Sequence, residues 1–164
     1  MPVTTMTPQA QEAPRPAPAD DAPRILVVDD DIVHRMVICR VAAKAGYVAI
    51  QAGSYEEAEP MLRDGGIACI SLDLSLGRRG GIDVLQLIAK YAPKTPVIII
   101  SGSDVGIRAE AVDFARRLGL DSCEPMPKPV NLGELKQKLT QMKLLADAGL
   151  RAPTTTVLAA TAAD

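Results

Sequence analysis

The chain has 164 residues, of which 48% are hydrophobic and 23% charged, and its formal net charge is −2 at pH 7. These values are ordinary for one globular domain, and they argue against the basic surface patch expected of a nucleic-acid-binding protein. With one Phe, three Tyr and no Trp, any core must be aliphatic.

The three cysteines, Cys39, Cys69 and Cys123, are odd in number and irregularly spaced, which predicts reduced thiols and no disulfide framework. A zinc site needs closer spacing and more partners, and His34 is the only histidine. No apolar run is long enough to cross a bilayer, and the N-terminus lacks the regions of a signal peptide. We therefore expect a cytoplasmic protein with no membrane partner.

The two ends of the chain differ from its middle in composition. Residues 1–23 contain six prolines with Ala, Thr and Gln between them, which predicts a disordered Pro/Ala-rich arm. Residues 149–164 predict a flexible tail. The folded domain is therefore expected at residues 24–148.

Strand and helix patterns alternate from the start of the folded part. The β-branched apolar run at 24–29 predicts a strand. A helix that ends at Gly46 is expected next, because apolar residues recur at helical spacing, namely Val33, Met36, Val37 and Val41. Residues 47–52 predict a second strand, and a capping box that begins at Ser54 predicts a short helix to about Arg63.

The alternation continues through the middle of the chain. Residues 67–73 predict a third strand, residues 81–91 a helix, residues 96–101 a fourth strand, and residues 104–118 another helix.

A fifth strand and a final helix complete the pattern. The strand is expected at 120–125, where Pro125 and Pro127 make the pattern irregular. Asn131 caps the helix, whose apolar stripe consists of Leu132, Leu135, Leu139, Met142 and Leu145.

Five strand–helix units in succession predict an α/β fold with a parallel sheet covered on both faces. In a chain this short they fit the doubly wound, flavodoxin-like (βα)5 arrangement with strand order 2-1-3-4-5. In such sheets the functional site lies beyond the carboxyl ends of the strands, near strands 1 and 3.

Polar residues follow four of the five predicted strands. They are Asp29, Asp30 and Asp31 after strand 1, Asp73 after strand 3, Ser101 after strand 4 and Lys128 after strand 5. Carboxylates that converge repel one another, and a hard divalent cation such as Mg²⁺ relieves that repulsion. The hydroxyl and the ammonium group suit a phosphoryl anion. The set therefore predicts a phosphoryl-transfer site with a carboxylate nucleophile.

Each residue also has an ordinary structural explanation. Asp31 is best interpreted as a helix cap, Ser101 fits a turn, and Lys128 fits a solvated surface. The occurrence of these residues at successive strand ends favours the functional interpretation.

Four segments carry a resemblance to a known family. They are ILVVDDD, ISLDLSL with Gly81 eight residues after Asp73, VIIISG, and MPKPV followed by an amphipathic helix. Residues 24 to about 145 resemble the receiver domain of bacterial two-component response regulators, in its single-domain form. The resemblance implies that Asp73 accepts a phosphoryl group from a histidine kinase or a histidine phosphotransfer protein.

The resemblance also implies roles for the neighbouring residues. Asp30 would bind Mg²⁺ directly, Asp29 through water, and the Ser75 backbone carbonyl would add a ligand beside Asp73. Ser101 would then bond the phosphoryl oxygens.

By the same resemblance, Lys128 would pair with the acyl phosphate.

Two departures from the family pattern stand out. Gly77 occupies a position where receivers commonly have proline, and no aromatic residue lies near Cys123 or Pro125, where many receivers carry a switch residue. We therefore expect intact phosphorylation chemistry and an unusual output surface.

Three other polar residues have plain interpretations. His34 is expected to be a partly exposed helical residue, with an influence on the acidic cluster at low pH as the alternative. Arg78 and Arg79 are interpreted as loop solubility charges, with steering of an acidic partner as the alternative.

Three functions remain open at this level. The leading hypothesis is a stand-alone receiver, not an enzyme, that signals or relays phosphate by binding an unknown downstream protein as a monomer or weak phosphorylation-dependent dimer. The alternative is a pseudo-receiver that acts without phosphorylation. An Asp-dependent phosphatase is a third possibility, but Ser75 stands where such enzymes place a second Asp.

Overall fold

The computed structural model describes residues 21–77, 80–102, 105–120 and 123–150. Its strands are β1 (Arg24–Val28), β2 (Val48–Ala52), β3 (Cys69–Asp73), β4 (Val97–Ser101) and β5 (Cys123–Pro127). Its helices are α1 (Ile32–Lys44), α2 (Tyr55–Asp64), α3 (Gly81–Tyr91), α4 (Val105–Arg117) and α5 (Leu132–Asp147). The ends assigned by sequence to an arm and a tail lie mostly outside these residues.

The five strands form one parallel sheet in the order β2-β1-β3-β4-β5. This order confirms the predicted flavodoxin-like fold. β1 and β3 are direct neighbours, with Val28 opposite Leu72. Asp29 and Asp73 therefore leave the sheet side by side at its carboxyl edge.

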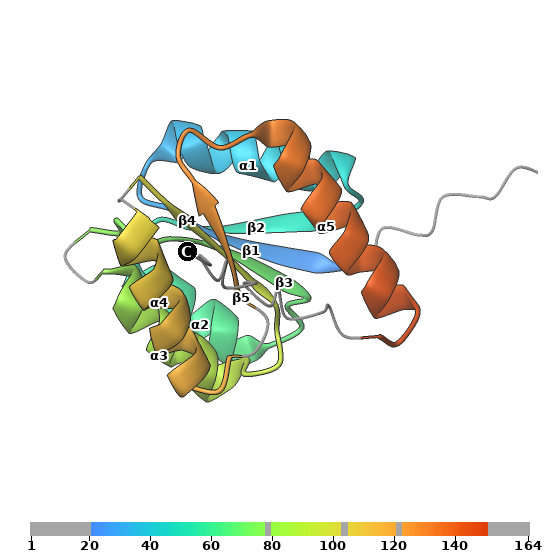
Figure 1. Cartoon of the computed structure of the whole chain (residues 1–164). Helices are drawn as coiled ribbons and strands as arrows, with labels where there is room; N and C mark the ends of the chain where they lie inside the picture. The colour runs from blue at the N-terminus through green and yellow to red at the C-terminus, as the bar shows by residue number, and fades with distance from the viewer. Residues whose placement is uncertain (1–20, 78–79, 103–104, 121–122, 151–164) are drawn as a thin grey trace, which may run out of the picture.

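Helices cover both faces of the sheet (Figure 1). Leu26 and Val28 of β1 pack into the layer that holds α2, α3 and α4, while Ile25 and Val27 point the other way, towards α1 and α5. Side chains alternate between faces along a strand, so both faces of β1 must be apolar. The two resulting clusters are largely aliphatic, as the composition predicts.

The fifth strand was misplaced by the sequence prediction. It covers Cys123–Pro127, whereas the pattern suggested 120–125, and residues 121–122 lie outside the described part. Proline is tolerated at this position because β5 is an edge strand, which does not need a full set of backbone donors. Met126 is buried between two exposed prolines, so the short strand still contributes a core side chain.

The buried face of α1 also differs from its apolar stripe. Val33 and Met36 are exposed, while Ile38, Val41 and Ala42 are buried. Only residues 29–31 separate β1 from α1, so the apolar side chains of the first turn of α1 lie at the rim of the sheet. The helix was predicted, but the stripe did not reveal which residues the sheet covers.

The final helix shows the same effect at its start. Leu135, Leu139 and Met142 are buried as expected, whereas Leu132 is exposed.

In the described part of the chain, no helix is long and apolar enough to span a membrane.

The predicted caps on three helices are confirmed. Asp31, Ser54 and Asn131 each accept a backbone N–H from the first turn of the helix they precede. The backbone N–H of His34 bonds to Asp31 and is the main reason why the pKa of that carboxyl lies below its usual range. Asp31 is thus a cap, as the sequence suggested, and a charged neighbour of the acidic residues before it.

Candidate functional site

Three carboxylates converge at the carboxyl edge of the sheet. Oxygen atoms of Asp29, Asp30 and Asp73 all lie within 4.8 Å of one another. Asp29 and Asp73 are buried, with 1% and 2% exposure, while Asp30 is exposed. Clustered buried carboxylates need compensating positive charge, and the oxygen-only donor set with one solvent-facing member suits a hard divalent cation.

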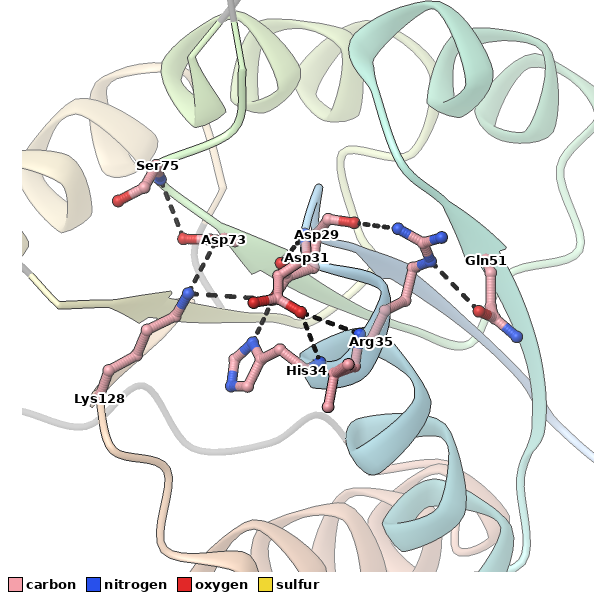
Figure 2. A network of polar contacts seen from close by, with 9 residues as sticks. Asp29, Asp31, His34, Arg35, Gln51, Asp73, Ser75 and Lys128 are labelled. Atoms are coloured by element: carbon pink, nitrogen blue, oxygen red, sulfur yellow. Dashed lines mark hydrogen bonds and ion pairs between the residues drawn. The ribbon is translucent and has the colours of Figure 1, made fainter.

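A side-chain ammonium group and a backbone N–H both donate to the Asp73 carboxylate (Figure 2). The Lys128 Nζ lies 2.8 Å from its Oδ2, and the Ser75 backbone N–H donates to its Oδ1 over 2.9 Å. Lys128 follows β5 and Asp73 ends β3, so two strands that are not neighbours supply the ion pair. The chain thereby compensates the cost of burying this carboxylate.

Asp29 is held on both of its carboxylate oxygens. The Asp31 N–H donates to its Oδ1 over 2.9 Å, the Nδ1 of His34 contacts its Oδ2, and Lys128 Nζ lies 3.9 Å from the same Oδ2. Arg35 donates to the backbone carbonyl of Asp29. Figure 2 shows these groups around the start of α1.

The contact of His34 was only partly foreseen. Its side chain is helical and partly exposed, at 22%, as the sequence suggested, yet it also touches the acidic cluster. The role of Arg35, which reaches both Asp29 and the side chain of Gln51 on β2, was missed. The only available signal was the position of both residues in the first turns of the helix after the Asp cluster.

The loop after Asp73 contacts the exposed carboxylate. The backbone N–H of Gly77 donates to the Asp30 Oδ2 over a long 3.4 Å, and Gly77 has a φ of +34°. Proline has no N–H and a fixed negative φ, so it could make neither this contact nor this turn. Glycine instead of proline at position 77 therefore allows the loop to contact the acidic cluster. Arg78 and Arg79 lie outside the described residues.

Ser101 ends β4 beside the cluster. Ile100 is paired with Asp73 across the sheet, so Ser101 lies one residue further towards the carboxyl edge. It is completely buried, and its carbonyl accepts the Lys128 backbone N–H over 3.0 Å. The structure thus brings a hydroxyl, an ammonium group and three carboxylates to one edge, as the strand ends predicted.

Gly81 fixes the position of the strand end that carries Asp73. A Cβ at this position would lie 2.6 Å from the Leu74 Cα and 2.8 Å from the Asp73 carbonyl oxygen. Both atoms belong to the backbone and cannot move away cheaply. The absent side chain lets the first turn of α3 pack directly on the end of β3.

Comparisons with known proteins point to one protein family. The family model of the response regulator receiver domain matches residues 25–140. The chain is 34% identical over 146 residues to a protein-glutamate methylesterase/protein-glutamine glutaminase of Anaeromyxobacter dehalogenans, a match that covers 84% of this chain and 40% of that protein. The chain therefore spans well under half the length of that relative.

Two further similarities concern a chemotaxis protein and a solved structure with the same fold. Chemotaxis protein CheY of Thermotoga maritima is 31% identical over 98 residues, covering 56% of this chain and 82% of that protein. A Burkholderia pseudomallei response regulator, crystallised with a phosphorylated aspartic acid, calcium ion and citrate, superposes with a TM-score of 0.62 at 22% identity, over 77% of this chain and 72% of that one.

Proposed function

The chain belongs to the family of response regulator receiver domains, and from that membership we propose that it accepts a phosphoryl group on Asp73. Receiver domains are signalling modules of two-component systems and are typically not catalytic. The observation that carries the proposal is the buried Asp73 carboxylate, paired with Lys128 at 2.8 Å beside two further carboxylates. A fold relative with a phosphorylated aspartic acid is consistent with it.

We propose that Asp29, Asp30 and Asp73 hold Mg²⁺, with the Ser75 backbone carbonyl as a further ligand. The acidic triad is typical of the receiver Mg²⁺ site, and its oxygens lie close enough to share one ion. When bound, the ion offsets negative charge on the phosphoryl oxygens.

The proposed transfer is a nucleophilic displacement at phosphorus. A carboxylate oxygen of Asp73 forms a new P–O bond, and the P–N bond of a donor phosphohistidine breaks. The donor imidazole keeps the electron pair and takes up a proton from solvent. Lys128 already donates to Asp73 and stays paired with the acyl phosphate after the transfer. Ser101 donates a hydrogen bond to a phosphoryl oxygen.

The surface around the site suits a protein donor. Ile32, Val33 and Met36 of α1 and Leu132 of α5 are all exposed near the carboxyl edge of the sheet. α1 and α5 lie on the same face of the sheet (Figure 1). An apolar rim beside a charged site favours contact with a histidine kinase or phosphotransfer protein over a free small molecule.

We propose further that residues 24–148 form the whole receiver and that its output is binding to another protein. A pseudo-receiver is the second candidate, because Pro125 stands on β5 near the place of the usual aromatic switch residue. The full set of acidic residues and Lys128 supports the phosphorylated form. Absence of Mg²⁺ binding in a calorimetric titration would favour the pseudo-receiver.

The function is tested by incubating the protein with Mg²⁺ and acetyl phosphate and separating the products on a phosphate-affinity gel. Wild type is expected to give one retarded band, and Asp73→Ala none. Asp83→Ala, which changes a carboxylate of α3 outside the cluster, is the matched control and should resemble wild type. An unmodified wild type, or equal modification of Asp73→Ala, contradicts the proposal.

A further inference from the structure

A groove of about 530 Å³ lies between α3 and α4. The two helices lie next to each other on one face of the sheet (Figure 1). The α4 wall is a single stripe of the helix, because Ile107, Glu110, Ala111 and Phe114 are spaced three, four and seven residues apart. Ile82 lies on the α3 side. Ile82 and Ile107 are 40% and 52% exposed, so apolar lining of the groove is open to a partner. The charged side chains of Glu110, Asp113 and Arg117 also line it.

The floor of this groove is joined to the phosphoryl-acceptor residue. Leu74 lines the groove and directly follows Asp73. Its N–H donates to the Ile100 carbonyl over 3.0 Å, and its carbonyl accepts the Gly81 N–H over 3.1 Å. Leu74 is thus fixed to β4 on one side and to the start of α3 on the other. A displacement of the Asp73 backbone would reach this groove residue through the peptide bond that joins the two.

The shape of the groove favours a helix as its occupant. A second copy of this chain, related by a two-fold axis through the groove, would present the same concave surface and leave a void. The ridge of a single partner helix is convex and fits between two helices. Apolar side chains on that ridge would cover Ile82, Ile107 and Phe114.

The charges on α4 set the direction of the partner helix. Glu110 and Arg117 both line the groove, are seven residues apart and have no ion pair with other described residues. Their separation is about 10 Å along the helix axis. Asp113 also lines the groove, but its charge is paired with Arg116 at 3.5 Å. Glu110 and Arg117 therefore offer two opposite charges, two turns apart.

A partner helix that runs antiparallel to α4 meets Arg117 first and Glu110 second. It would carry an acidic residue followed seven positions later by a basic one. This order also suits the partner's own dipole, which favours acidic residues near the N-terminus and basic residues near the C-terminus. The parallel direction would reverse the order and lose that agreement.

We propose that the α3–α4 groove binds an antiparallel amphipathic helix of a partner protein, with Asp or Glu facing Arg117, apolar residues in the groove, and Lys or Arg facing Glu110. The inference deepens the proposed function, since it supplies the output surface, and it rests on that function only for its dependence on phosphorylation.

The test uses two synthetic helical peptides and the full chain labelled with ¹⁵N. The first peptide has Glu, two Leu and Lys at positions i, i+3, i+4 and i+7, and the second has Glu and Lys exchanged. Wild type is expected to bind the first about fivefold more tightly. The exchanged peptide either meets two like charges in the antiparallel direction or has to bind parallel to α4, with its charges opposed to its own helix dipole. The shifted amide signals should belong to α3, α4 and Leu74.

Charge reversal in the protein provides the decisive comparison. The double variant Glu110→Lys/Arg117→Glu should prefer the exchanged peptide by a similar factor. The matched control is Glu56→Lys/Arg63→Glu, which reverses two exposed α2 charges at the same spacing and should keep the wild-type preference. Binding without a reversed preference, or shifts confined to other elements, overturns the proposal. So do groove signals that move with protein concentration alone, which would identify a second copy as the occupant.

Phosphorylation is followed by intact mass in the same samples. The first peptide should bind with a changed affinity once acetyl phosphate and Mg²⁺ have modified the protein. If the protein is phosphorylated but its groove binds neither peptide, the groove is not a helix-binding site, and the proposed function still holds. A protein that binds the first peptide but is never modified refutes the proposed function instead.

Discussion

At the scale of single residues, the central contact of the site is the ion pair between Asp73 and Lys128. Asp73 and Lys128 follow strands of a parallel sheet, whose carboxyl ends must meet at one edge, so their 2.8 Å contact follows from topology. The contact of His34 with Asp29 could not be predicted, because it depends on the rotation of α1 about its axis. The exposed Val33 and Met36 show that the apolar stripe does not define that rotation.

Asp30 is the carboxylate whose removal tests the metal site most cleanly. It is exposed, unlike Asp29 and Asp73, so replacing it leaves no buried group unpaired. Asp30→Asn should weaken Mg²⁺ binding by about tenfold or more, because one charged ligand is lost. Titration calorimetry measures this change. Asp64→Asn, on the exposed end of α2, should bind Mg²⁺ like wild type. An unchanged Mg²⁺ affinity in Asp30→Asn would exclude Asp30 as a ligand.

Cys69 provides a test of burial and its pH dependence. Desolvation of this fully buried thiol raises its pKa to about 12, from an ordinary value of 9.0. Because the folded pKa is raised, the thiol's contribution to stability is complete below pH 9 and declines as the pH rises towards 12. The melting temperature should therefore fall through that range, with a smaller fall in Cys69→Ala.

The same thiol should be unreactive in the folded protein. At pH 8 we expect iodoacetamide to label the partly buried Cys39 before Cys69, and urea to expose Cys69 to labelling. Peptide mass spectrometry identifies the labelled sites. Equal labelling rates for the two thiols in the folded chain would show that Cys69 is not in the core.

At the scale of elements, helix starts were easier to predict than the last strand. Caps such as Ser54 and Asn131 are local signals, because side chain and backbone lie within three residues of each other. The position of β5 is not local. Pro125 and Pro127 oppose a strand unless it lies at a sheet edge, and only the assembled sheet shows that it does.

The junction between β3 and α3 depends on a missing side chain. Gly81→Ala would place a Cβ 2.6 Å from the Leu74 Cα, and such overpacking should lower the free energy of unfolding by about 1–3 kcal/mol. Urea titration measures it. Gly133→Ala on α5 is the control, because its Cβ would meet only Asn131 Oδ1 at 3.4 Å. Stability equal to wild type in Gly81→Ala would refute this account of the junction.

At the scale of the whole molecule, five apolar runs alternating with helices predicted the sheet order before any contact was known. Right-handed crossovers and burial of both sheet faces leave few arrangements for such a chain. The groove between α3 and α4 could not be predicted, since it depends on how two helices of the same layer pack. The alternation of strands and helices therefore predicts the fold, whereas the shape of this groove depends on tertiary packing.

The central claim is that the whole arrangement serves phosphoryl acceptance on Asp73. Intact-mass spectrometry during incubation with acetyl phosphate tests it most directly, with Mg²⁺ or with a chelator present. We predict that wild type gains the mass of one phosphoryl group in Mg²⁺ only, that hydroxylamine removes it as expected of an acyl phosphate, and that Asp73→Ala gains nothing. A wild-type mass that never changes, or a gain that persists in Asp73→Ala, would contradict the account.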